Sequence, residues 1–213
     1  MIELIFQQQY EAFVLLAFAL IFSLTFHEYG HGKVASLIGD DTAERAGRLT
    51  LNPIPHIHPV GLLMIFFIGI GFAKPVPADP RKFNTRWGVL MVAAAGPAMN
   101  LLLAVVCINL YGLGLKLGIP LFQTEVAAYF FYYLVVINFL LMLFNLLPIG
   151  PLDGSYILPY ALPKDLRVKY LQLNHKYGIF LLMGLIAASF LGIPVLNWLL
   201  QLGQVLADLF RFI

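Results

Sequence analysis

Residues 11–37 read EAFVLLAFALIFSLTFHEYGHGKVASL, and this stretch decides how the rest of the chain is interpreted. A membrane-crossing helix needs about 20 mostly apolar residues, which the stretch supplies. Its second half nevertheless carries His27, Glu28 and His31. Ionisable side chains are costly inside a bilayer and usually have a function there. The stretch therefore predicts a membrane-spanning helix with a functional polar cluster towards its end.

The composition of the whole chain points to the bilayer as its environment. Of its 213 residues, 61% are hydrophobic and 11% are charged, whereas an ordinary soluble domain is about 45–50% apolar and about 25% charged. We therefore expect an integral membrane protein surrounded by lipid. The net charge of +2 is too small to indicate nucleic-acid binding, so no nucleic-acid partner is expected. Cys107 is the only cysteine, which excludes an intrachain disulfide framework and a cysteine-based metal site.

Three further apolar stretches are long enough to cross a bilayer, at residues 87–115, 126–148 and 177–207. Gly192-Ile193-Pro194 interrupts the last of these, because glycine and proline mark turns. The interruption predicts either two short spans or one span followed by an interfacial helix. Taken together, the stretches predict an all-α polytopic membrane protein with about five transmembrane helices.

One apolar run, residues 60–73, is too short to span. It contains three glycines and is bracketed by prolines on both sides. Such a run more often dips into the membrane or lines a protein interior, so we interpret it as re-entrant. With that interpretation, eleven of the thirteen lysines and arginines fall in two connections, after the first span and after the third. The positive-inside rule makes those connections cytoplasmic and leaves the N-terminus outside.

This topology brings three potential metal ligands to one depth. His27 and His31 are four residues apart, so both project from one face of a helix and can close on one cation. Glu28 lies between them. A catalytic zinc site takes three protein ligands and leaves a position for water. Asp153, which follows the third span near the same cytoplasmic end, is the candidate third ligand.

Structural alternatives compete with this interpretation. His27, Glu28 and His31 could form a solvent-facing polar cluster, and Asp153 could be an interfacial carboxylate or a turn residue. His56 and His58 lie in a proline-rich stretch and are expected to be turn residues rather than ligands, with His56 bonding a backbone carbonyl.

Asn100 and Asn145 are two of the amides that lie within or at the end of apolar spans, where an amide must find partners. Asn100 and Asn145 could each make a helix–helix hydrogen bond. Either could instead donate to a reacting carbonyl or to the backbone of a substrate. The sequence leaves both interpretations open.

Three motifs in order resemble one family. They are His27-Glu28-x-x-His31, Gly96-Pro97-x-x-Asn100, and Asn145-x-x-Pro148-x-x-x-x-Asp153-Gly154, and they lie on or directly after successive spans. Together they resemble the site-2 protease family of intramembrane zinc metalloproteases, over roughly residues 10–160. The resemblance implies a minimal member without a PDZ or CBS domain. Residues 1–213 would form one transmembrane metalloprotease domain, with a catalytic core at about 10–160 and C-terminal helices at about 177–213.

The resemblance also implies roles. One zinc ion would be bound by His27, His31 and Asp153, with Glu28 as general base. Asn145 would help to hold substrate or the oxyanion, and residues 45–80 would form a membrane-associated β-hairpin near the site. The implied function is hydrolysis of peptide bonds in or next to transmembrane segments of membrane proteins, in the cell membrane, with the site near the cytoplasmic face. The oligomeric state is not predicted.

Two other functions fit parts of the pattern. A catalytically silent homologue could bind membrane helices as an adaptor, but the intact motif residues argue against it. A metal transporter would need ligands in both halves of the bilayer. The candidate ligands here lie at one depth, which disfavours transport.

Overall fold

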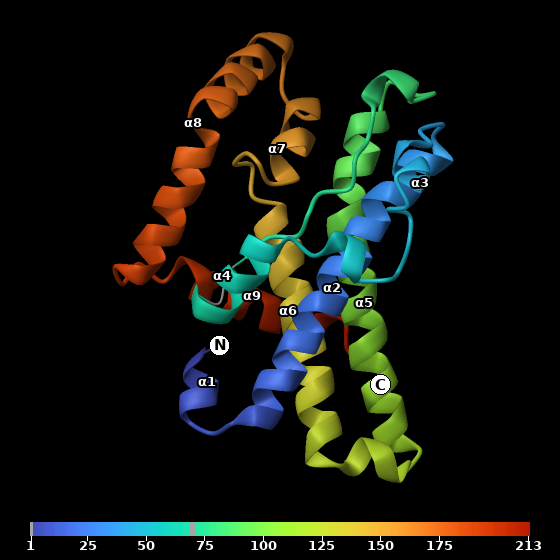
Figure 1. The fold of residues 1–213 in the computed structure, drawn as a ribbon, viewed down its shortest axis with the longest axis vertical. Coiled ribbons are helices and arrows are strands. Elements are labelled where there is room, and N and C mark those ends of the chain that lie inside the picture. Colours follow the sequence, from blue (N-terminus) through green and yellow to red (C-terminus); the bar gives the residue numbers. More distant parts are fainter. Residues whose placement is uncertain (1, 69–70) are drawn as a thin grey trace.

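The computed structural model describes residues 2–68 and 71–213, and the regular structure within them is helical (Figure 1). The three longest apolar helices are α2 (Tyr10–Leu37), α5 (Gly88–Lys116) and α6 (Glu125–Asn145). The other α-helices are α1 (Ile2–Phe6), α3 (Thr42–Arg45), α4 (Pro59–Ile68), α7 (Gly154–Ile157), α8 (Lys164–Phe190) and α9 (Val195–Leu209). Short 3-10 turns are η1 (Ile54–His56), η2 (Pro80–Lys82), η3 (Pro120–Gln123) and η4 (Leu158–Tyr160).

The expectation of about five transmembrane helices is wrong. Among the described residues, three helices are long and apolar enough to cross a membrane, namely α2, α5 and α6. The uncharged part of α8 begins only after Lys176, and at 1.5 Å per residue it covers about 21 Å of the roughly 30 Å hydrocarbon core. Helix α9 has 15 residues and is also too short. Gly192 lies at the break between α8 and α9, with a φ of +95°.

 The φ of Gly192, like the φ of +103° at Gly39 just after α2, lies in the left-handed region that glycine adopts freely.

The β-hairpin expected at residues 45–80 is also wrong. Within the described part of this segment there is no strand: it forms α3's last residue, η1, α4 and an extended stretch at 71–79. Residues 69 and 70 of the apolar run lie outside the described residues. Prolines explain the missing ladder, because six of them between residues 53 and 80 lack the N–H that a strand needs. Among the described residues, one backbone hydrogen bond joins residues 45–58 to residues 71–80, from the Lys74 N–H to the His56 carbonyl at 2.8 Å.

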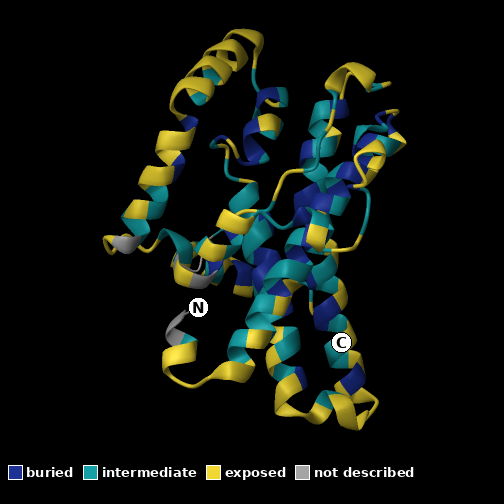
Figure 2. Ribbon diagram, in the orientation of Figure 1, coloured by how far each residue is buried: buried dark blue, intermediate teal, exposed yellow. Residues whose placement is uncertain are grey.

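Helices α2, α5 and α6 pack against one another through small residues (Figure 1). Ala19 of α2 and Ala104 of α5 are fully buried in this core. At Gly30 an added Cβ would lie 2.8 Å from the Ala95 carbonyl oxygen, so the backbones of α2 and α5 approach closely there. Small residues permit such approaches between membrane helices. Buried residues are densest where these helices meet, and α8 stands largely exposed beside them (Figure 2).

Helix α9 crosses α6 rather than running beside it (Figure 1). Gly203 of α9 lies against Phe139 of α6, where an added Cβ would be 3.3 Å from the phenylalanine Cβ. The chain end then docks on α5, because Asn109 donates to the Phe210 carbonyl and accepts from the Phe212 N–H, both at 2.8 Å. The C-terminal helix therefore braces the side of the bundle.

Candidate metal centre

The structure brings His27, His31 and Asp153 together. The two histidine Nε2 atoms are 3.0 Å apart. Nε2 of His27 lies 3.2 Å from Asp153 Oδ2, and Nε2 of His31 lies 3.4 Å from Asp153 Oδ1. In a tetrahedral zinc site with bonds of about 2.0–2.1 Å, neighbouring ligand atoms are about 3.3 Å apart. The triangle therefore has the size of one face of a zinc coordination shell.

The carboxylate of Asp153 supports this fit. Asp153 Oδ2 is buried and makes no hydrogen bond within the described residues. Leaving a buried carboxylate oxygen without a partner costs free energy. A cation bound between the carboxylate and the two histidines removes that cost.

The other ring nitrogen of each histidine faces an acceptor. His27 Nδ1 lies 2.6 Å from the Asn100 side-chain oxygen, and His31 Nδ1 lies 2.6 Å from the Val92 carbonyl oxygen. An acceptor at Nδ1 requires the proton there, which leaves the Nε2 lone pair free for a metal. Both imidazoles are therefore held in the tautomer that binds a cation through Nε2.

Gly96 of α5 lets that helix approach the two imidazoles. A Cβ at this position would lie 2.3 Å from His31 Nε2 and 2.6 Å from His27 Cε1. No side chain fits there, so the glycine forms part of the metal centre although it offers no ligand.

The loop between α6 and α7 carries Asp153 and is held by α8. Gly150 donates its N–H to the Asn174 side-chain oxygen at 2.7 Å. The Tyr170 hydroxyl donates to the Pro148 carbonyl at 3.0 Å. Gly154 packs so closely that a Cβ would lie 2.2 Å from the Leu146 carbonyl oxygen. The position of Asp153, the candidate third ligand, thus depends on the α6–α7 loop and on helix α8 together.

Glu28 lies on the wall of the same cavity as the three candidate ligands. The cavity has a volume of about 610 Å³. Glu28 Oε2 accepts a hydrogen bond from the Val76 N–H at 2.8 Å, which fixes the carboxylate. The other lining residues are mainly apolar and include Leu24, Phe72, Val89, Phe144 and Tyr156.

We call residues 71–79 the strap, because this extended segment passes over Glu28. One end is held at Lys74, whose N–H donates to the His56 carbonyl and whose carbonyl accepts from Arg48 at 2.6 Å. The other end is held at Asp79, whose N–H donates to Asp40 Oδ2 at 2.7 Å. The strap is therefore anchored on both sides of the Val76 N–H that binds Glu28.

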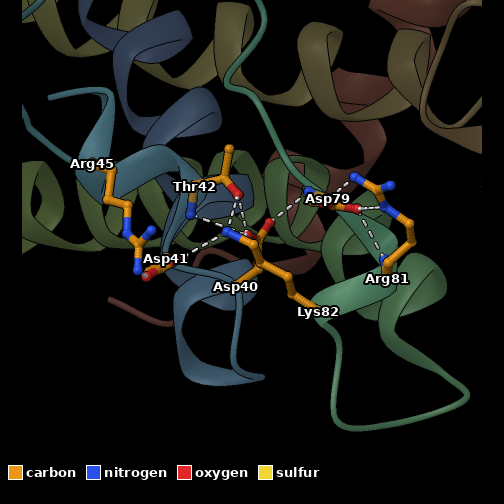
Figure 3. A network of polar contacts seen from close by, with 7 residues as sticks. All are labelled: Asp40, Asp41, Thr42, Arg45, Asp79, Arg81 and Lys82. Carbon is orange, nitrogen blue, oxygen red and sulfur yellow. Dashed lines mark hydrogen bonds and ion pairs between the residues drawn. The ribbon is translucent and has the colours of Figure 1, made fainter.

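Asp40 is the centre of the second anchor (Figure 3). Its side chain is fully buried and accepts from the Asp79 N–H and from both the N–H and the hydroxyl of Thr42. Lys82 lies 3.8 Å away. Arg81 bonds both oxygens of the Asp79 carboxylate and lowers its pKa to about 2.

The pKa of Asp40 is also lowered. Burial raises it, but the hydrogen bonds from Thr42 and from the Asp79 N–H outweigh burial. A carboxyl group whose folded pKa lies below its unfolded value stabilises the fold above that unfolded value, about 3.9. We therefore expect the anchor to contribute fully at neutral pH and to weaken as the pH falls below about 4.

Replacing Asp40 by alanine is expected to loosen the strap. The change leaves the Asp79 N–H without its acceptor and removes the bonds to Thr42, which should lower the free energy of unfolding by about 2 kcal/mol. Asp41→Ala is the matched control: Asp41 pairs with Arg45 and Lys82 at the surface, where ion pairs contribute little. Thermal unfolding and hydrogen exchange of the strap amides measure both variants. Equal behaviour of the two would contradict the anchoring role.

The remaining polar residues from the sequence analysis lie as follows. Asn145 lines the cavity, and one of its N–H groups donates to the Leu141 carbonyl of its own helix at 2.9 Å. Asn100 is fully buried and contacts His27 rather than the cavity.

His56 bonds the Thr50 carbonyl at 2.9 Å, as expected for a turn residue. His58 accepts weakly from the Gly61 N–H at 3.4 Å. Neither His56 nor His58 joins the group of His27, His31 and Asp153.

Sequence reasoning missed several contacts around the site. It gave no role to the Val92 carbonyl, the Val76 N–H or Asn138, which bonds Asn100 at 2.8 Å. The two backbone groups carry no residue-type signal. Asn138 did offer one, because it is an amide in an uncharged span and such groups need partners.

Known proteins of similar sequence identify the family to which this chain belongs. The sequence matches Peptidase family M50 over residues 15–123 and 116–185. YwhC of Bacillus subtilis is 38% identical over 192 residues, which cover 85% of this chain and 85% of YwhC. Rip2 of Mycolicibacterium smegmatis is 33% identical over 201 residues, covering 89% of this chain and 71% of Rip2. Rip2 of Mycobacterium tuberculosis is 32% identical over 202 residues, covering 91% and 75%. All three relatives are named as zinc metalloproteases.

No solved structure matches the chain. The family match nevertheless confirms three predictions from the sequence: the family, the enzyme class and the zinc cofactor. With three helices able to cross a bilayer, the chain is also a membrane protein. It belongs to peptidase family M50, the site-2 protease family, and is a zinc metallopeptidase.

Proposed function

We propose that the protein hydrolyses peptide bonds in or next to transmembrane segments of membrane-protein substrates. One observation carries the proposal: the candidate zinc ligands and Glu28 open onto a single, mainly apolar cavity bounded by the three membrane-crossing helices. An apolar wall suits an apolar segment of substrate. The catalytic core at residues 10–160 contains all of these groups.

In this proposal His27, His31 and Asp153 hold the zinc ion. When bound, zinc supplies a Lewis acid that polarises the scissile carbonyl and makes water a nucleophile near neutral pH. Glu28 takes the proton of the attacking water and passes it to the leaving amine. Its carboxylate is kept in place by the Val76 N–H.

Asn145 is the proposed contact to the substrate. It lies on the cavity wall, and only one of its two N–H groups is used by the Leu141 carbonyl. The second N–H can donate to a substrate carbonyl or to the oxyanion. The substrate must be locally unwound before this happens, because a helix hides its carbonyls in hydrogen bonds.

We also propose that the site lies near the cytoplasmic face of the cell membrane and that the N-terminus is outside. The distribution of basic residues supports this topology. The strap, α3 and the start of α8 bring most of them to the end of the bundle where α2 finishes and α5 begins (Figure 1). The basic residues in these connections are Lys33, Arg45, Arg48, Lys74, Arg81, Lys82, Arg86, Lys164, Arg167, Lys169 and Lys176.

Comparative membrane proteomics tests the proposed function. Cells that carry the wild-type chain are compared with cells that carry Glu28→Gln, and anchored proteins that accumulate uncut are identified. A substrate found in this way is then reconstituted with purified enzyme in liposomes, and mass spectrometry locates the cleaved bond. We expect cleavage in or beside its membrane-spanning segment. Cleavage confined to a water-soluble region far from any such segment would contradict the proposal.

A further inference from the structure

A chain of buried polar side chains connects the three membrane-crossing helices beside the metal centre. Ser23 of α2, Asn100 of α5 and Asn138 of α6 are each fully buried. Asn100 Nδ2 donates to Asn138 Oδ1 at 2.8 Å and to the Ser23 carbonyl at 3.3 Å. Asn138 Nδ2 donates to Ser23 Oγ and to the Leu134 carbonyl, both at 2.8 Å. The chain ends at His27 Nδ1, 2.6 Å from Asn100 Oδ1.

The hydrogen bonds in this chain can run in one direction only. The Leu134 carbonyl is an acceptor, so Asn138 must turn its NH₂ group towards it and its oxygen towards Asn100. Asn100 must then present its NH₂ group to Asn138, which leaves its oxygen facing His27. His27 must therefore carry its proton on Nδ1, and its Nε2 lone pair points at His31 and Asp153.

We propose that Asn138 and Ser23 are positioning residues for the metal centre, acting on His27 through Asn100. Asn138 sets the orientation of the Asn100 amide, and Ser23 provides acceptors for both amides. Without them Asn100 can rotate and offer its NH₂ group to His27, which favours the tautomer protonated on Nε2. That tautomer cannot bind zinc through Nε2. The inference rests on His27 being a zinc ligand, as in the proposed function.

A purely structural role is the alternative, since amides join helices in membranes. Asn109 provides a matched control for it. This asparagine also lies on α5 and also joins two segments, through bonds to the Phe210 carbonyl and the Phe212 N–H. Within the described residues, the hydrogen bonds of Asn109 go to Val105, Phe210 and Phe212, and none reaches Ser23, Asn100, Asn138 or His27. Asn109→Leu therefore removes a helix-joining amide without touching the metal centre.

The experiment measures zinc affinity in purified, detergent-solubilised protein by competition with a chromogenic chelator. The visible spectrum of the cobalt-substituted protein reports on ligand geometry, and thermal unfolding reports on stability. Asn100→Leu should weaken zinc binding by about 10- to 100-fold, as loss of a direct partner of a ligating histidine does. Asn138→Leu, one step further away, should weaken it by about tenfold and change the cobalt spectrum. Asn109→Leu should leave affinity and spectrum at wild-type values even if it lowers stability.

The double variant Asn100→Leu/Asn138→Leu decides the mechanism. If Asn138 acts through Asn100, the double variant binds zinc as weakly as Asn100→Leu alone. Additive losses would overturn the inference, as would equal zinc affinities of Asn138→Leu and Asn109→Leu. If Asn138→Leu does not fold, Ser23→Ala is used instead, because it deletes the hydroxyl that accepts from Asn138. We expect Ser23→Ala to lower zinc affinity by about threefold. An unchanged zinc affinity of Ser23→Ala would also overturn the inference. Failure of the wild-type protein to bind zinc would overturn the assignment of His27 as well, so the two failures are distinguishable.

Discussion

Glu28→Gln is expected to abolish peptide hydrolysis while leaving zinc bound. Glutamine has the same shape, and its side-chain oxygen can still accept from the Val76 N–H that holds Glu28 at 2.8 Å. It cannot take a proton from water, so the contribution of general acid–base catalysis, about 10²- to 10⁴-fold in rate, is lost. The change leaves the proposed zinc ligands His27, His31 and Asp153 in place. Cleavage rate and zinc content of the same purified sample measure the two effects separately.

Glu44→Gln is the control for this change, because Glu44 is an exposed glutamate of α3 that does not line the cavity. It removes the same charge and should cleave at the wild-type rate. A zinc-loaded Glu28→Gln protein that cleaves as fast as wild type would rule out Glu28 as the base. Loss of zinc from Glu28→Gln would instead mean that the carboxylate holds the metal, directly or through the strap.

The composition predicted a membrane protein, and the spacing of His27 and His31 predicted two candidate metal ligands on one helix face. A period of four residues puts two imidazoles on one helix face wherever the helix lies, so their proximity is a local property. Asp153 is different, because it is more than a hundred residues away. Its placement followed from counting basic residues along the chain, and the structure does bring it within 3.4 Å of both histidines.

The errors in the fold have identifiable physical causes. Residues 177–207 carry no charge, which predicts either two short spans or one span followed by an interfacial helix. Their length, once divided at Gly192-Ile193-Pro194, is too short for either half to cross a bilayer. The β-hairpin came from resemblance alone. The prolines of residues 53–80 argued against it, since each removes one ladder hydrogen bond.

The contacts that orient the ligands depend on tertiary packing. Whether the Val92 carbonyl faces His31 is decided by how far α5 slides along α2, which no local pattern reports. Gly96 shows the same limit. The sequence shows a glycine followed by a proline in a predicted helix. Only the packing of α5 against α2 shows that two imidazoles lie against the Gly96 Cα.

Gly96→Ala is therefore expected to disrupt the zinc site, although it is a small change in an apolar helix. The new Cβ would lie 2.3 Å from His31 Nε2 and 2.6 Å from His27 Cε1, and no real Cβ tolerates such distances. Either the imidazoles turn away from Asp153 or α5 moves away from α2. Displacements of about 1 Å at a reacting centre cost on the order of 100-fold in rate. We expect zinc affinity and cleavage rate to fall together by at least about that factor.

Gly184→Ala separates this clash from a general effect of alanine in a helix. Gly184 lies in α8, and a Cβ there would meet no atom within 4 Å. Alanine favours helix over glycine by about 1 kcal/mol, so Gly184→Ala should be neutral or slightly stabilising and should bind zinc normally. Gly96→Ala gains the same helix propensity, which means that any loss of zinc affinity comes from the contact with the histidines. Normal zinc binding by Gly96→Ala would show that the two helices can separate without cost to the site, and the close approach of α5 would then have no part in holding the metal.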